Sequence, residues 1–325
     1  MDNLCHTLVG LSLAESGLKR KTALGTATLL VGANLPDVDV LAYAWGPVTA
    51  LGFRRGWTHG VLAIAVWPLV LAGLMLAWDR GVRRRREPGA APADPWWLVV
   101  LAAMSVMSHP LLDFLNTYGV RFLMPFSDRW FYGDTLFIVD PWIWILLLAG
   151  AIWSRRQWSK EVPRAGGPAR VALVLTLTYA LAMAALNVAG RRLVETAQSA
   201  RLTIRHLMTA PVPANPFQRD VVMDTDRGYV RTSIAWLERP SLGDDWDVIS
   251  KGDSTSEART AAATSDGRTY LRWARFPVFQ VERQQGGALV RISDARYPGQ
   301  SWAEVAIPVN RPLSLPRTTP APERP

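Results

Sequence analysis

The chain has 325 residues, of which 49% are hydrophobic, and it carries a formal net charge of +9. This composition excludes a disordered or collagen-like protein, and the single cysteine, Cys5, excludes an intramolecular disulfide. The basic excess could serve nucleic-acid binding, anionic-lipid binding or membrane topology, so the positions of the charges must distinguish these classes. A mean hydropathy of +0.08 is consistent with one apolar half and one polar half.

Two short apolar runs, 4–18 and 22–35, open the chain and are separated by three basic residues at 19–21. Each is too short for a full membrane span, which needs at least roughly 17 apolar residues. We therefore predict a helical hairpin that only partly crosses the bilayer. A basic stretch followed by a cleavage site is absent from this N-terminus, so a removed signal peptide is not expected.

Four longer apolar runs follow. Residues 61–78, 95–108 and 171–190 contain no charged side chain, and 136–153 contains only Asp140. A helix that crosses a bilayer needs about 20 apolar residues. We predict four full spans, which with the hairpin make an α-helical polytopic membrane domain.

Thirteen basic residues form three clusters at alternate ends of these spans. The positive-inside rule places such clusters in the cytoplasm. The loops 42–60 and 113–135 and everything after Arg192 would then lie outside. We expect a multi-pass protein of the bacterial cytoplasmic (inner) membrane. The clustering of basic residues in short turns argues against nucleic-acid binding. The clusters are Lys19, Arg20 and Lys21; Arg80, Arg83, Arg84, Arg85 and Arg86; and Arg155, Arg156, Lys160, Arg164 and Arg170.

The C-terminal half has the short alternating apolar runs that are typical of strands. A Gly-Gly pair at 286–287 indicates a hairpin turn, and the polar stretch 250–267 is expected to be a loop. We predict a small antiparallel β domain on the extracytoplasmic side. Its expected strands are 229–236, 269–274, 278–282, 288–292 and 302–309.

These patterns divide the chain into four parts. A membrane domain would cover 1–195, and a linker marked by Pro211, Pro213 and Pro216 would cover 196–216. The β-rich domain would cover 217–311, and the Pro-rich tail 312–325 is expected to be disordered.

Three of the four histidines, His6, His59 and His109, lie in the membrane half beside other polar residues. Ionisable groups at membrane depth are costly and indicate functional sites. His206 stands apart in the polar half, and Cys5 is expected to be a small core residue.

Helix geometry brings the membrane-half groups to a common depth. At 1.5 Å per residue, His6 lies roughly 20 Å from Lys19, and Asp37 roughly 24 Å from Lys21. His59 begins a span from the outside, and the run ending at Asp113 leaves toward it. These groups should gather near the outer interface.

Imidazoles and carboxylates together suit zinc or another divalent transition metal. His109 and Asp113 share a helix face if the helix continues past Pro110, and Asp37 and Asp39 would share one side of an extended segment. His59 near a helix N-terminus should favour the neutral ligand form. The candidate metal ligands are His6, Asp37, Asp39, His59, His109 and Asp113.

Four residues are candidates for a catalytic role beside the metal. Arg54 and Arg55 could orient an anionic ester through their guanidinium groups. Asp39 or Asp140, if not needed for coordination, could act as general base.

These motifs resemble those of the YdjM-type family of bacterial inner-membrane metal-dependent hydrolases. The resemblance covers about residues 1–150 and rests on His6, the Asn-Leu-Pro-Asp-Val-Asp run at 34–39, the Arg-Arg-Gly-Trp-Thr-His run at 54–59, and His109 with Asp113 and Asn116. Arg54 stands where the family commonly has a histidine. The Pro-Asp-x-Asp and His-x-x-x-Asp elements are also similar to those of zinc-dependent phospholipases C. The resemblance implies a hydrolase with a phospholipase-like substrate.

The leading hypothesis is a membrane-bound metal-dependent hydrolase that acts at the outer face of the membrane on a lipid or other phosphoester or ester. A non-enzymatic membrane protein with a structural metal or polar cluster and a partner-binding β domain is the alternative. A transporter is a third hypothesis, disfavoured because the charged groups gather at one interface and not at the midplane. The substrate, the metal and the oligomeric state stay open.

Overall fold

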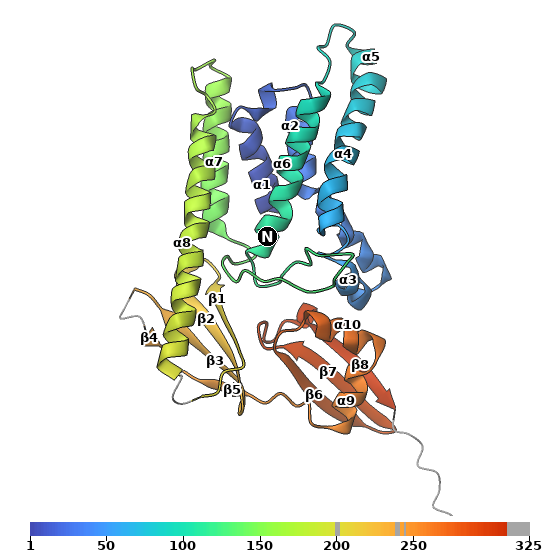
Figure 1. Cartoon of the computed structure of the whole chain (residues 1–325), viewed down its shortest axis with the longest axis vertical. Helices are drawn as coiled ribbons and strands as arrows, with labels where there is room; N and C mark the ends of the chain where they lie inside the picture. The colour runs from blue at the N-terminus through green and yellow to red at the C-terminus, as the bar shows by residue number, and fades with distance from the viewer. Residues whose placement is uncertain (199–201, 238–240, 244, 311–325) are drawn as a thin grey trace, which may run out of the picture. The chain divides into compact units, whose positions relative to one another are not determined.

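The computed structural model describes residues 1–198, 202–237, 241–243 and 245–310, so the predicted disordered tail 312–325 lies outside the described residues. The chain forms two compact units, Met1–Asp226 with Val230–Asp247, and Arg227–Tyr229 with Val248–Pro325. Figure 1 shows the helices of the N-terminal part running alongside one another. They are α1 (Asn3–Glu15), η1 (Leu18–Arg20), α2 (Gly25–Asn34), η2 (Leu35–Trp45), α3 (Pro47–Phe53), α4 (Val61–Trp78), η3 (Asp79–Arg83), α5 (Arg84–Arg86), α6 (Pro95–Phe114), α7 (Pro141–Trp158) and α8 (Gly167–Gln198).

Three helical segments of the described chain are long and apolar enough to cross a membrane: Val61–Arg86, Pro95–Phe114 and Gly167–Gln198. Each contains one of the predicted spans. The fourth predicted span, 136–153, forms α7, which begins only at Pro141 because the Asp140 carboxylate caps it. The last turn of α7 contains two arginines. This helix is not one of the three membrane-length segments.

The predicted N-terminal hairpin is present as α1 and α2, and glycines allow its helices to pack closely. A Cβ on Gly10 would lie 2.7 Å from the Leu29 carbonyl oxygen, and one on Gly32 would overlap Ser105 Oγ on α6. Small residues at such crossings are typical of membrane helix packing. The α2 helix is therefore held between α1 and α6, which positions the chain entering η2.

A buried core joins α1 to α7 and α8. Cys5 belongs to it, as expected of a small apolar side chain, together with Leu8 and Val9 on the same helix. The facing helices contribute residues such as Leu147 and Met183. This core fixes the start of α1, where His6 lies.

The first sheet packs against α8. It has the order β1-β2-β3-β4, with β5 paired to β3. The segment 196–216, expected as a linker, contains the end of α8 and strand β1. Its prolines do not mark a linker, because Pro211 lies at an irregularity of an edge strand, where proline is tolerated. The strands are β1 (His206–Val212), β2 (Asn215–Thr225), β3 (Gly228–Ala235), β4 (Ser241–Leu242) and β5 (Asp247–Ile249).

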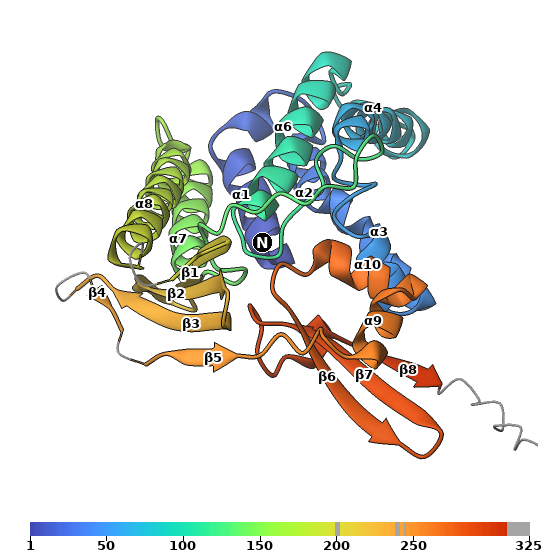
Figure 2. The same cartoon turned by 60° about the horizontal axis from the view of Figure 1, so that its bottom comes forward.

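The second sheet is antiparallel, with the order β6-β7-β8, and two short helices cover one of its faces (Figure 2). The β6–β7 hairpin confirms the predicted turn, with Gly286 in the left-handed region at a φ of 89°. The elements are α9 (Ser256–Ala262), α10 (Ser265–Trp273), β6 (Pro277–Gln284), β7 (Gly287–Asp294), η4 (Ser301–Ala303) and β8 (Glu304–Asn310).

Two local predictions in this part are wrong. The stretch 250–267, expected as a loop, contains α9, and the strand expected at 269–274 is part of α10. Thr255 and Thr264 cap these helices by accepting from backbone N–H groups three residues on. Tyr270 and Trp273 are three residues apart and both buried, which is the spacing of one helical face and not of one face of a strand.

Candidate metal centre

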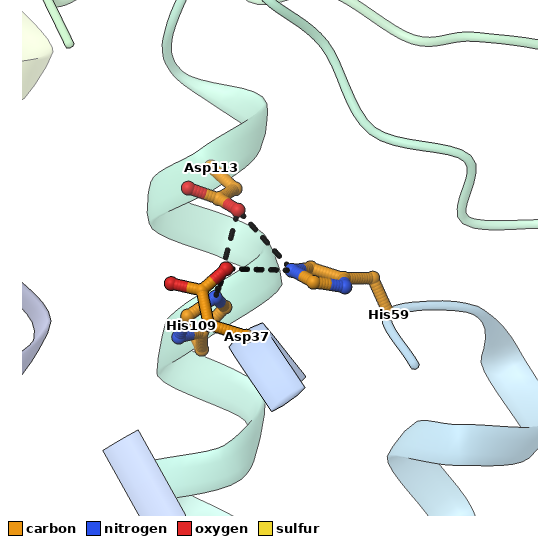
Figure 3. A group of neighbouring side chains, drawn as sticks. All are labelled: Asp37, His59, His109 and Asp113. Carbon is orange, nitrogen blue, oxygen red and sulfur yellow. Dashed lines mark ion pairs between the residues drawn. The ribbon is translucent and has the colours of Figure 1, made fainter. Parts of the chain in front are cut away.

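Four buried side chains from three separate elements meet in the helical part (Figure 3). Asp37 comes from η2, His59 from the turn before α4, and His109 and Asp113 from α6. One ligand atom from each lies within 4.8 Å of all the others. The structure thus brings together four of the six residues expected to bind metal.

Local sequence explains how each element presents its ligand. Pro36 near the start of η2 favours helical entry, and α6 continues through Pro110, so His109 and Asp113 stay on one face. Gly56 and Gly60 form the turn before α4. A Cβ at Gly60 would overlap the Met124 carbonyl oxygen, so only glycine allows this close approach.

The four facing atoms are buried and lack hydrogen-bond partners: Asp37 Oδ1, His59 Nε2, His109 Nε2 and Asp113 Oδ2. His59 Nε2 lies 3.3 Å from Asp113 Oδ2 and 4.0 Å from Asp37 Oδ1. His109 Nε2 lies 3.6 Å from each of these oxygens. A tetrahedral ion with bonds of about 2.1 Å separates its ligands by about 3.4 Å, so these residues fit a divalent metal.

Hydrogen bonds behind the histidines turn the correct nitrogens toward this centre. His109 Nδ1 lies 2.7 Å from the Ala33 carbonyl oxygen and donates to it, because a carbonyl can only accept. Thr58 donates its hydroxyl proton to Asp39 and so accepts from His59 Nδ1 at 2.9 Å. Both Nε2 atoms therefore carry lone pairs, as metal-ligating histidines require.

Asp39 lies behind His59 and not among the four facing atoms. Its Oδ2 accepts from the Arg55 N–H at 2.8 Å and from the Thr58 hydroxyl at 3.0 Å, and lies 3.4 Å from His59 Nδ1. Its Oδ1 accepts from Arg54 Nε at 3.3 Å. The expectation that Asp37 and Asp39 share one side of an extended segment is wrong, because η2 has three residues per turn, which directs them apart.

His6 adjoins the centre on the other side of Asp113. Its Nε2 lies 3.3 Å from Asp113 Oδ1, the oxygen that does not face the four-atom group. Its ring stacks on His109 with centroids 3.7 Å apart. The Met1 amino group also bonds to Asp113 Oδ1. His6 is therefore a neighbour of the ligand set in this structure.

The two arginines have different surroundings. Arg55 is buried, with Nε 3.1 Å from Asp113 Oδ2, Nη1 donating to Asn116 Oδ1 at 3.2 Å, and its guanidinium over the Tyr118 ring. Its φ of 50° is left-handed, a conformation that costs roughly 1–3 kcal/mol in a non-glycine residue. Arg55 thus links Asp113 to Asn116.

Arg54 is the arginine with a side chain open to solvent, at 19% exposure. Its Nη2 lies 3.7 Å from Asp37 Oδ1, and Nη1 donates to the Tyr43 hydroxyl at 3.3 Å. A guanidinium in this position is able to meet an anion at the edge of the centre.

Asp140 is not one of the four grouped residues, and its contacts are those of a helix cap. Its Oδ1 caps α7 by accepting from the Trp142 and Ile143 N–H groups, and its Oδ2 accepts from the Tyr179 hydroxyl at 3.0 Å. These bonds tie α7 to α8. They favour a capping role for Asp140 over that of a general base.

Sequence reasoning missed the residues that orient the ligands. Thr58 and the Ala33 carbonyl group set the histidine tautomers, and Tyr118 supports Arg55. Thr58 precedes His59 directly, which was an available signal, but a backbone carbonyl carries none.

His59 and Asp37, the two candidate ligands that lie outside the predicted membrane spans, have shifted pKa values. Burial lowers the pKa of His59 below its ordinary value and favours the neutral imidazole. Burial alone would raise the pKa of Asp37, but a protonated His109 beside it would outweigh that effect and lower the pKa. A neutral histidine and an ionised carboxylate are the forms that bind metal.

Comparison with known proteins relates the helical part to a family. The model of the YdjM inner membrane protein family matches residues 1–192. The uncharacterized protein YfhP of Bacillus subtilis (strain 168) is 26% identical over 162 residues, which are 47% of this chain and 46% of YfhP. The chain thus spans about half the length of this relative. No solved structure matches the chain.

Proposed function

The chain belongs to the YdjM inner membrane protein family, and from this premise we propose that it is a membrane-bound metal-dependent hydrolase. Its substrate would be a lipid or other phosphoester or ester. In this proposal α7 is a fourth span beside the three longer ones, and the basic clusters lie in the cytoplasm. The metal centre and the chain after Arg192 then lie at the outer face.

The observation that carries the proposal is the set of four buried atoms that face one another and have no hydrogen-bond partner. Each unsatisfied buried polar atom costs roughly 1–3 kcal/mol, and an ion coordinated by all four atoms would offset this cost. Two imidazoles and two carboxylates suit zinc.

A bound divalent ion supplies Lewis acidity that makes water nucleophilic at neutral pH. The chain's own residues would perform the other tasks. Asp37, His59, His109 and Asp113 hold the ion, and Arg54 orients an anionic oxygen of the ester. His6, whose Nδ1 has no hydrogen-bond partner and whose ring stacks on His109, is better placed to accept a proton than Asp39 or Asp140, whose oxygens are already engaged.

One observation favours a second candidate, a structural metal in a non-enzymatic protein. Four protein ligands can fill a tetrahedral site, whereas catalytic zinc keeps an open position. The ligand types favour catalysis, because structural zinc sites are rich in cysteine and Cys5 lies in the core of α1. In this second candidate the β part would bind a partner.

Metal analysis of the purified full chain tests the site. We expect about one zinc per chain and loss of that zinc in the His59→Ala/His109→Ala double variant, because only two ligands remain. His206→Ala is the matched control, since His206 is an exposed histidine of β1. A double variant that keeps its full metal content would show that the ligand assignment is wrong.

A hydrolysis screen separates the two candidates. Phospholipids and acyl lipids are incubated with the protein, with and without chelator. Product release that chelator abolishes supports the hydrolase. Retained metal without any chelator-sensitive product supports the structural metal.

A further inference from the structure

A surface groove of about 540 Å³ lies directly beside the metal centre. Asp37, one of the four ligand residues, lines it together with residues of α1, α2 and η2. The groove is open and not an enclosed cavity. The lining residues are Asn3, Leu30, Val31, Asn34, Leu35 and Val38.

The groove has both apolar and polar lining residues. Leu30, Val31, Leu35 and Val38 are apolar, and Asn3, Asn34 and Asp37 are polar. The Asn34 side chain is fixed there, since it accepts from the Thr7 hydroxyl and donates to the Leu30 carbonyl oxygen. Such a lining matches a molecule with a hydrocarbon chain and a compact polar group.

An apolar collar continues from the groove along η2 and α3. Leu41 is 65% exposed and Trp45 is 72% exposed, although both follow closely after the metal ligand Asp37. Exposed apolar patches of this kind mark a membrane or protein contact, and the three membrane-length helices of this unit favour the membrane. The collar consists of Val38, Val40, Leu41, Tyr43, Trp45 and Phe53.

We propose that this groove receives one acyl chain of a bilayer phospholipid and brings its ester or phosphodiester group to Asp37 and Arg54. The lipid would reach the centre sideways from the outer leaflet, and the collar would lie in the acyl boundary. Arg54, beside Asp37, complements the negative charge of the phosphodiester. This inference rests on the proposed function and names its substrate class.

Photo-crosslinking tests the groove without requiring turnover. The zinc-loaded full chain is placed in phosphatidylcholine nanodiscs that contain a small fraction of phosphatidylglycerol with an acyl-chain diazirine. We expect labelling to concentrate on residues 30–38. It should fall about tenfold in Leu30→Trp and in Val38→Trp, because filling the groove removes roughly two methylene contacts.

Leu69→Trp is the matched control, because Leu69 is 60% exposed on α4 and lies outside the groove; its labelling should not change. Labelling of residues 30–38 no stronger than that of the exposed face of α4, or unaffected by the groove variants, would overturn the proposal. If Leu30→Trp fails to fold, Val38→Trp, at an exposed position, decides alone.

Zinc content, measured in parallel, separates this failure from that of the proposed function. A protein that retains zinc but shows no groove labelling would refute the lipid groove and leave the proposed function standing. Groove labelling in a chain that binds no metal would refute the metal-dependent hydrolase and leave a lipid-binding groove.

Discussion

At the scale of single residues, Asp39 links three parts of the candidate centre. It accepts from the backbone of Arg55, from Thr58 and from Arg54, and it lies 3.4 Å from His59 Nδ1. Carboxylates in this position fix the tautomer and orientation of a metal-binding histidine. Asp39 is therefore a positioning residue for His59.

Replacing Asp39→Asn should weaken zinc binding by about 10–100-fold, as loss of an outer partner does. The site should still fill at excess zinc, because all four facing residues remain. Competition with a chromogenic chelator measures the affinity and the stoichiometry.

Asp140→Asn is the control, since asparagine also caps helices well, and it should leave the affinity unchanged. Loss of stoichiometric binding in Asp39→Asn would instead make Asp39 a direct ligand, and an unchanged affinity would remove its positioning role.

At the scale of residues, the sequence predicts which side chains form the candidate site but not how they are arranged. Helix periodicity and the polar breaks at membrane depth identified Asp37, His59, His109 and Asp113, which the structure groups. The direction of a side chain after a proline depends on the local helix type, and the 3₁₀ geometry of η2 separates Asp39 from Asp37. Arg54 and Arg55 are neighbours in sequence, but only the left-handed backbone of Arg55 buries it against Asp113.

At the scale of elements, the geometry of the candidate metal centre depends on how closely α2 approaches α6. Ala33 at the end of α2 accepts from His109 on α6, and η2 follows at once with Asp37. Gly32 makes the approach possible, since a Cβ there would also lie 3.1 Å from the Leu71 side chain on α4. A shift of α2 would move one ligand and the partner of another.

Gly32→Ala should therefore lower both the thermal stability and the zinc affinity. Overpacking a tight contact costs typically about 1–3 kcal/mol, and the displaced Ala33 carbonyl would release His109. Thermal unfolding in detergent and zinc competition measure the two effects.

Gly73→Ala is the matched control: Gly73 lies on α4, and a Cβ added there would meet nothing within 4 Å, so the zinc affinity should not change and the thermal stability should not fall. A Gly32→Ala protein with wild-type stability and zinc affinity would show that the close packing of α2 does not support the centre.

Sequence patterns predict element types well where apolar runs are long and poorly where they are short. The helices of the membrane part follow from runs of uncharged residues, because few other structures satisfy the backbone in lipid. In the polar half, the pattern predicts a strand where α10 forms, because a run of six residues is too short to distinguish the two periods; Tyr270 and Trp273, three residues apart, share the buried face of the helix. The capping threonines at 255 and 264 are the signal that distinguishes the helices.

At the scale of the whole molecule, helices α1 to α8 and most of the first sheet form one unit. Arg219 on β2 is buried and donates to the Asp134 and Met183 carbonyl oxygens, while burial lowers its pKa to about 10. Thr209 on β1 bonds to Asn187 on α8. No sequence period reports such contacts, because they join residues that are distant along the chain.

The orientation of the chain decides which side of the membrane the metal centre serves. The basic run 83–86 follows α4, and Gly89 lies between α5 and α6. If this turn is cytoplasmic, then α6, about 30 Å long at 1.5 Å per residue, carries Asp113 to the outer face. The chain after α8 should then lie outside as well, since α8 is the last of the membrane-length helices described.

Single-cysteine labelling tests this orientation, because the only native thiol, Cys5, is buried and should not react. In spheroplasts, an impermeant maleimide should label Asp253→Cys, at an exposed position, without lysis. Gly89→Cys, where nothing lies within 4 Å, should react only after lysis, and the unmodified chain should stay unlabelled in both. The reverse pattern would place the metal centre at the cytoplasmic face, where an outer-leaflet lipid could not reach it.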